Sequence, residues 1–105
     1  MTLPKNKVSP SETEELRMAA GAWLQEIRKA AGLKQRDLAI ALDFDYYTFV
    51  SQLENGRGRV PAHKYRDWAR MVGVDEKVFA KKMLGFYDPV SYDILFGDED
   101  SVASS

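Results

Sequence analysis

Apolar residues recur at spacings of three and four along most of the chain, which is the period of an α-helix with one buried face. The first stripe runs from Leu16 to Ala31, behind a capping-box pattern at Ser11 and Glu14, and it ends at Gly32. No segment alternates apolar and polar residues convincingly with the two-residue period of a strand. The pattern therefore predicts an all-α protein.

Five further helices are expected from the same spacing. They span residues 34–42, 46–55, 61–72, 76–84 and 88–96. Among these five helices, those that end at residues 55, 72, 84 and 96 are each followed by glycine, and Asp88 and Pro89 form a start signal for the final helix. Gly21 lies inside the first stripe and is interpreted as dividing an N-terminal extension from the helix proper.

Composition divides the chain into four parts. Residues 1–10 contain two prolines and little apolar content, which predicts a flexible arm. Residues 11–85 hold the five-helix domain with its N-terminal extension, and residues 86–97 form a short extra helix or a dimerisation segment. Residues 98–105 are expected to be an acidic, disordered tail.

The residue types present exclude several kinds of site. The 105 residues include no cysteine and one histidine, so we expect no disulfide, thiol nucleophile or zinc site, and a reducing, cytoplasmic compartment. No apolar run is long enough to span a membrane, and no phosphate loop or nucleophile elbow occurs. Enzyme activity, metals and cofactors are therefore not expected. His63 is interpreted as a surface or capping residue, with a phosphate contact as the alternative.

The net charge of −1 is unevenly distributed. Residues 25–70 carry nine basic and six acidic side chains, whereas residues 71–105 carry three basic and seven acidic ones. A basic middle followed by an acidic end is compatible with a polyanionic partner.

The helix expected at residues 46–55 has two unlike faces. The apolar face, expected in the core, consists of Tyr46, Phe49, Val50 and Leu53. The polar, uncharged face consists of Tyr47, Thr48, Ser51, Gln52 and Asn55. Hydroxyl and amide groups on a helix can read base edges in the major groove, so this face predicts DNA recognition. For Tyr47, packing against the preceding helix is the alternative.

The segments "GLKQRDLAIAL" and "VSQLENGRGRVP" together resemble the Cro/CI-type (XRE) helix-turn-helix family of bacterial and phage regulators, over about residues 24–74. The features that carry the resemblance are Arg28 ahead of Gly32, Gln35 opening the second helix, and "LENG" closing the third. It implies a helix-turn-helix DNA-binding domain in which Arg28 and Glu54 form a partly buried ion pair.

The same resemblance implies two sets of DNA contacts. The residues that would face the bases are Tyr47, Thr48, Ser51 and Gln52. The residues that would contact phosphates are Lys34, Gln35, Arg36, Asn55, Arg57 and Arg59. Phosphate contacts fix position rather than sequence. For Arg57 and Arg59, ordinary solvated loop charges are the alternative.

Three positions depart from the family pattern. Asp43 stands where the family usually has glycine in a left-handed turn, and Lys34 replaces the usual capping residue of the second helix, which forgoes about 1 kcal/mol. The link from Leu42 to Leu53 is one residue longer than usual. Residues 44–46 must then form a modified turn, which leaves the register of the reading face open by one position.

The implied function is a sequence-specific double-stranded DNA-binding transcriptional regulator, most simply a repressor, acting in the cytoplasm and nucleoid of a bacterium. One reading helix covers few base pairs, so a homodimer on an inverted repeat is expected. The expected dimerisation surface lies beyond the core motif and consists of Phe79, Met83, Phe86, Tyr87, Tyr92, Ile94, Leu95 and Phe96. The alternative is that these residues simply cap the core.

A protein-interaction module is the competing class. An antitoxin or a regulatory adaptor could use the same fold and bind a protein partner through the acidic tail or through "DPVSYDILFG". The polar face of the third helix and the arginines after it argue against this as the sole function.

Overall fold

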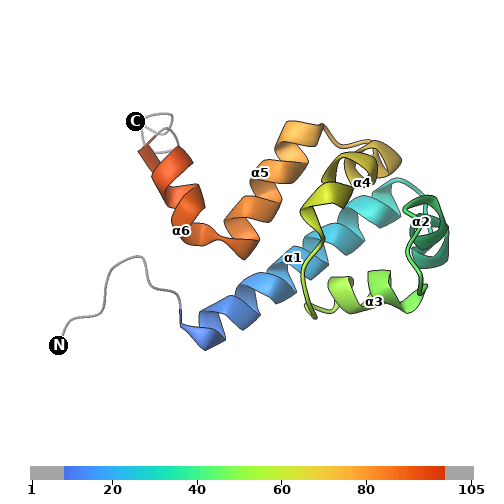
Figure 1. Cartoon of the computed structure of the whole chain (residues 1–105), viewed down its shortest axis with the longest axis horizontal. Helices are drawn as coiled ribbons and strands as arrows, with labels where there is room; N and C mark the ends of the chain where they lie inside the picture. Colours follow the sequence, from blue (N-terminus) through green and yellow to red (C-terminus); the bar gives the residue numbers. More distant parts are fainter. Residues whose placement is uncertain (1–8, 99–105) are drawn as a thin grey trace.

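The long helix α1 (Pro10–Ala30) packs against α3 (Thr48–Glu54) on one side and against α5 (Glu76–Tyr87) on the other (Figure 1). Helix α2 (Gln35–Ala41) joins α1 to α3, and the 3-10 turn η1 (Ala62–Lys64) leads into α4 (Tyr65–Val72). The described residues end shortly after α6 (Pro89–Tyr92) and the short π-helix η2 (Asp93–Gly97), and residues 99–105 of the predicted acidic tail lie outside them. The computed structural model describes residues 9–98, and this part of the chain is all-α, as predicted.

Helix α1 begins earlier than its sequence pattern predicts. The hydroxyl of Ser9 accepts a hydrogen bond from the backbone N–H of Glu12 at 3.2 Å, and Pro10 occupies the first turn. The predicted capping box at Ser11 and Glu14 is therefore wrong, because Pro10 has no N–H to lose and its φ already suits a first helical position. Residues 1–8 of the predicted arm lie outside the described residues.

Gly21 does not divide α1, which is continuous through this position. A Cβ atom on Gly21 would collide with the backbone carbonyl of Glu54, at the end of α3. The absent side chain is what lets the two helices approach so closely, and this outweighs the helix propensity that glycine lacks.

The core is continuous from α1 to α5. Its largest fully buried side chains are Leu24, Leu38, Leu42, Val50, Leu53, Trp68, Phe79 and Met83. The ring of Phe79 from α5 lies 5.5 Å from that of Trp23 and 6.3 Å from that of Trp68, centroid to centroid. Helix α5 is therefore an integral part of the domain and fixes α1 against α4.

Two helix ends differ from expectation near the C-terminal side. Helix α5 continues through Gly85, where its end was predicted, and the missing side chain there leaves room for the Tyr92 ring. Pro61 precedes η1 and does not open a long helix, since its ψ of 134° is extended. The predicted start signal at Asp88 is present: its carboxylate accepts from the backbone N–H of Ser91 at 3.2 Å.

Candidate nucleic-acid interface

The turn between α2 and α3 decides which side chains the third helix presents. Asp43 adopts a left-handed φ of 57°, a conformation that glycine adopts without the steric cost of a Cβ atom. The backbone N–H of Asp43 donates to the carbonyl of Ile40 and that of Phe44 to the carbonyl of Ala39, which completes a Schellman end for α2. Phe44 then turns inward, with its ring 4.8 Å from that of Phe49.

Helix α3 begins at Thr48, two residues later than predicted. Tyr46 is therefore not part of the helix, and its side chain is 75% exposed. The prediction that Tyr46 lies in the core is wrong, because Phe44 fills that place from the extended turn. The rest of the predicted apolar face is correct: Val50 and Leu53 are buried and Phe49 packs against the core.

The polar face of α3 lies on the surface of the molecule. Thr48, Gln52 and Asn55 are exposed, and Ser51 is partly exposed. Tyr47, immediately before the helix, is 51% exposed, and the Arg36 guanidinium lies 5.1 Å from the centre of its ring. Tyr47 is thus exposed to solvent and also contacts α2 through Arg36.

A buried ionic cluster holds this face in place from behind. The Nε and Nη2 atoms of Arg28 donate to the two carboxylate oxygens of Glu54 at 2.7 and 3.1 Å, and Nη1 donates to the carbonyl of Leu33 at 2.7 Å. The amide nitrogen of Gln35 donates to the same carboxylate at 3.0 Å. The expected ion pair is present, and through Gln35 it joins three helices, α1, α2 and α3.

The six predicted phosphate contacts do not share one environment. Lys34, Arg36, Asn55 and Arg57 are exposed around the ends of α2 and α3, whereas Gln35 is half-buried with its amide nitrogen directed to Glu54. Arg59 is also exposed, but its guanidinium lies 5.0 Å from the centre of the Tyr87 ring, on the side of α5. Arg59 is thus turned towards the C-terminal part of the molecule.

Lys64 was not singled out from the sequence, yet it completes the end of α2. Its ammonium group donates to the carbonyl of Leu42 at 2.5 Å and lies 5.4 Å from the centre of the Phe44 ring. A lysine near a helix C-terminus satisfies a carbonyl that the helix leaves unpaired. No local sequence signal marks this contact, because the two residues are far apart along the chain.

The predicted dimerisation residues are not all on one surface. Phe86 and Tyr87 pack against the core, and the Tyr87 hydroxyl accepts a hydrogen bond from the backbone N–H of Val60 at 3.2 Å. Burial raises the pKa of the Tyr87 phenol, which is the largest influence on it. Phe79 and Met83 are fully buried in the core, so their place in the predicted dimer surface is wrong. Of the predicted dimerisation residues, Ile94 and Leu95 are the strongly exposed ones, at 74% and 60%.

Comparison with known proteins identifies no relative of this chain. No family model matches this sequence, and no curated protein matches it significantly. Within residues 9–98, no helix is long and apolar enough to cross a membrane. In the same part of the chain, no group of three or more acidic or histidine side chains is placed to hold a metal ion.

Proposed function

We propose that this protein is a sequence-specific double-stranded DNA-binding regulator of the Cro/CI-type helix-turn-helix class, which inserts α3 into the major groove. The observation that carries the proposal is the division of α3 into a buried apolar side and an exposed side of uncharged polar groups. A helix fits the width of the major groove, where each base pair shows a distinct pattern of donors and acceptors.

Gln52 is the side chain best suited to direct base recognition. It is exposed in the middle of α3, and a glutamine amide can donate to and accept from adenine at the same time. Thr48 and Ser51 lie on the same side of α3 as Gln52, about one helical turn or less away from it along the chain. The proposed reading surface also includes Tyr46 and Tyr47, because both aromatic rings are exposed where the chain enters the helix.

The buried cluster behind α3 supports a recognition role for its outer face. A bidentate arginine–carboxylate pair constrains direction as well as distance, so it fixes the rotation of α3 relative to α1. A reading helix needs such a fixed rotation, since a small turn about its axis would present different side chains to the bases. Asn55, Arg57 and Lys34 would hold the flanking phosphates, which sets the register without reading sequence.

Helix α3 has seven residues and is about 10 Å long, so one copy contacts only a few base pairs. We therefore propose that two copies bind an inverted repeat, with half-sites separated by about 34 Å, one turn of the duplex. A protein bound across a promoter in this way would act most simply as a repressor.

The test separates base reading from phosphate contact. Sites are first selected from a random pool of duplexes, and affinities of the Gln52→Ala and Arg57→Ala variants are then measured across single-base changes and across salt concentrations. Gln52→Ala should lose about 1–3 kcal/mol at one position and become indifferent to the base there. Arg57→Ala should weaken all sequences alike and make the salt dependence shallower by about one unit of slope.

Gln25→Ala and Lys82→Ala are the matched controls, since both residues are exposed and lie on other helices. Neither should change affinity or selectivity. A protein that binds no duplex at low salt would contradict the proposal, as would Gln52→Ala and Arg57→Ala variants with the same profile.

A further inference from the structure

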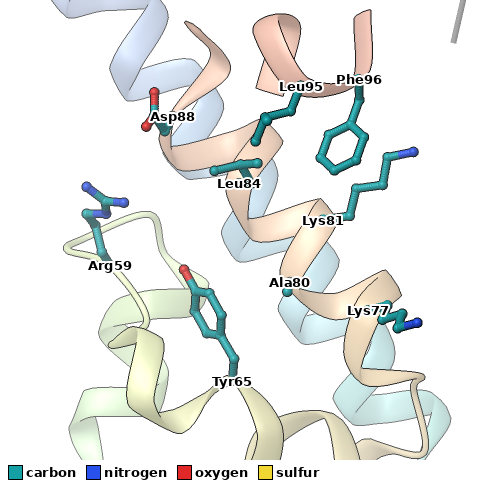
Figure 2. A pocket seen from close by; sticks show the side chains of 9 residues that line it. All are labelled: Arg59, Tyr65, Lys77, Ala80, Lys81, Leu84, Asp88, Leu95 and Phe96. Atoms are coloured by element: carbon teal, nitrogen blue, oxygen red, sulfur yellow. The ribbon is translucent and has the colours of Figure 1, made fainter. Parts of the chain in front are cut away.

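A groove of about 550 Å³ runs between α5 and the last turn of the chain (Figure 2). Ala80 and Leu84 of α5 form its floor, and Tyr65 of α4 closes it below. Leu95 and Phe96 point towards α5 from the terminal turn. The groove is therefore lined mainly by apolar atoms, and it is open on its outer side.

The rim of the groove is basic. Arg59 lies at one edge, and Lys77 and Lys81, one turn apart on α5, lie at the other. Asp88 is the one carboxylate among the lining residues that the structure describes. Two hydrogen bonds from Ser91 lower the pKa of Asp88 and keep it ionised, so the lining residues include three cationic side chains and one anionic side chain.

The terminal turn beside the groove has the opposite character. Ile94 is 74% exposed and Leu95 60% exposed, so two large apolar side chains meet water next to each other. Asp93 and Asp98 flank them, and both are exposed. The segment from residue 93 to residue 98 is thus apolar in the middle and acidic at its ends, whereas the groove is apolar in the middle and basic at its rim.

We propose that the segment 93–98 of a second copy of this chain occupies the groove, and that the exchange is mutual. Each copy then supplies one acidic, apolar turn and receives one, across a two-fold axis. In each copy, the turn that is donated also forms one wall of that copy's own groove. One closed pair therefore covers both grooves and both turns, and no open chain of copies results. The inference rests on the proposed function in one respect: it assigns the dimer surface that an inverted repeat requires.

A second copy explains more of the surface than a small ligand does. An amphipathic organic anion could fill the groove and contact its basic rim, but it would leave Ile94 in water. Two exposed aliphatic side chains beside an apolar groove are typical of a surface that another protein covers. The acidic residues beside Ile94 and Leu95 select a basic partner surface, and the groove of this same chain provides one.

The first experiment measures the molar mass of the full chain by sedimentation equilibrium without DNA. The wild type should be dimeric, and Ile94→Glu or Leu95→Glu should raise the dimer dissociation constant at least about a hundredfold, because each places a charge in an apolar contact. Ile40→Glu is the matched control: Ile40 is 56% exposed on α2, away from the groove, and the dissociation constant should not change.

A charge exchange provides the sharper test. The double variants Lys77→Glu/Lys81→Glu and Asp93→Lys/Asp98→Lys should each weaken self-association by about tenfold, since each faces like charge with like charge. An equimolar mixture of the two should regain wild-type affinity as a heterodimer, because every groove then meets a segment of opposite charge. Restored association also shows that both variants are folded.

Three results would overturn the proposal: a wild type that is monomeric at all accessible concentrations, a Leu95→Glu variant as dimeric as the wild type, or a mixture that does not associate. A monomeric wild type that binds the anilinonaphthalene sulfonate anion in this groove, with loss of binding in Lys77→Glu/Lys81→Glu, would replace the second copy with a small anion. DNA selection by Ile94→Glu distinguishes the two proposals. If Ile94→Glu is monomeric and still selects one half-site, the proposed DNA-reading function stands without the dimer. If the wild type is dimeric but selects no DNA sequence, only the proposed dimer surface stands.

Discussion

The helix pair α2–α3 and the C-terminal segment α6–η2 each expose a face that the core does not use, but the two faces differ in chemistry and in support. The face of α3 is polar, and the Arg28–Glu54–Gln35 cluster fixes it from behind. The face of η2 is apolar, and the segment contacts α5 through its rings, such as that of Phe96, whose centre lies 4.7 Å from the Lys81 ammonium nitrogen.

This contrast is the reason for proposing two different kinds of partner. Uncharged polar groups on a helix are well hydrated, so they can stay exposed until a ligand with matching donors and acceptors arrives. Exposed aliphatic groups are stabilised by removal from water, by about 25 cal/mol for each Å² that is covered. The first face suits a transient, specific complex, and the second suits a standing contact between protein surfaces.

The largest expected effect comes from breaking the cluster behind α3. Glu54→Ala should lower the free energy of unfolding by about 3–5 kcal/mol, because it leaves the Arg28 guanidinium buried without its carboxylate. The Glu54 side chain is only 1% exposed, so water cannot replace the lost partner. Urea unfolding, followed by circular dichroism, measures the change.

The chain contains a matched control for this prediction. Glu76 pairs with Arg66 and Arg70 at 3.1 Å each, but the Glu76 side chain is 41% exposed and both arginines are more exposed still. Glu76→Ala should therefore cost at most about 1 kcal/mol. Equal losses from Glu54→Ala and Glu76→Ala would show that the cluster behind α3 gives it no special support.

Helical spacing predicted the buried stripe of each long helix, because that signal is local and repeats within every turn. Leu24, Leu38 and Leu53 are buried as expected. Tyr46 could not be placed in this way, since its exposure depends on where α3 begins, and that depends on the turn before it. The turn is set by Asp43 and by the inward position of Phe44, which a count of apolar residues does not reveal.

Asp43→Gly tests how far this turn is strained. Glycine adopts a left-handed φ without the steric cost that a Cβ brings, so the variant should be more stable by about 0.5–1 kcal/mol. Asp45→Gly is the control, because Asp45 lies in the same turn and its φ is not positive. It should be neutral or slightly destabilising. The difference between the two midpoints of urea unfolding gives the answer, and a destabilised Asp43→Gly would mean that the carboxylate itself holds the turn.

The C-terminal groove was beyond sequence reasoning for a different reason. Its floor comes from α5, its lower edge from Tyr65 and its overhang from the last turn, so no single segment contains its pattern. The sequence contains many aromatic and aliphatic residues after residue 85. Their pattern predicts either a cap on the core or a dimer surface. The core-cap interpretation is correct for Phe86 and Tyr87, which pack on the core, whereas Ile94 and Leu95 are exposed.

The smallest expected effect is a pH dependence at the junction of the two regions, where Tyr65 and Tyr87 meet Arg59. Burial is the largest cause that raises the pKa of each phenol above its ordinary value near 10, so the folded chain holds these protons to higher pH than the unfolded chain does. Their contribution to stability is therefore complete below the ordinary phenol pKa and is lost as the pH rises through the folded values.

The free energy of unfolding should accordingly fall as the pH is raised above about 10, and part of that fall should be absent in Tyr65→Phe/Tyr87→Phe. Lysines also titrate in this range, so the difference between the wild type and the double variant isolates the phenols. Phenolate absorbance of the folded protein gives an independent measure, with two tyrosines ionising later than in the urea-unfolded chain. A double variant that loses stability with pH as steeply as the wild type would mean that burial at this junction does not hold the two phenols neutral.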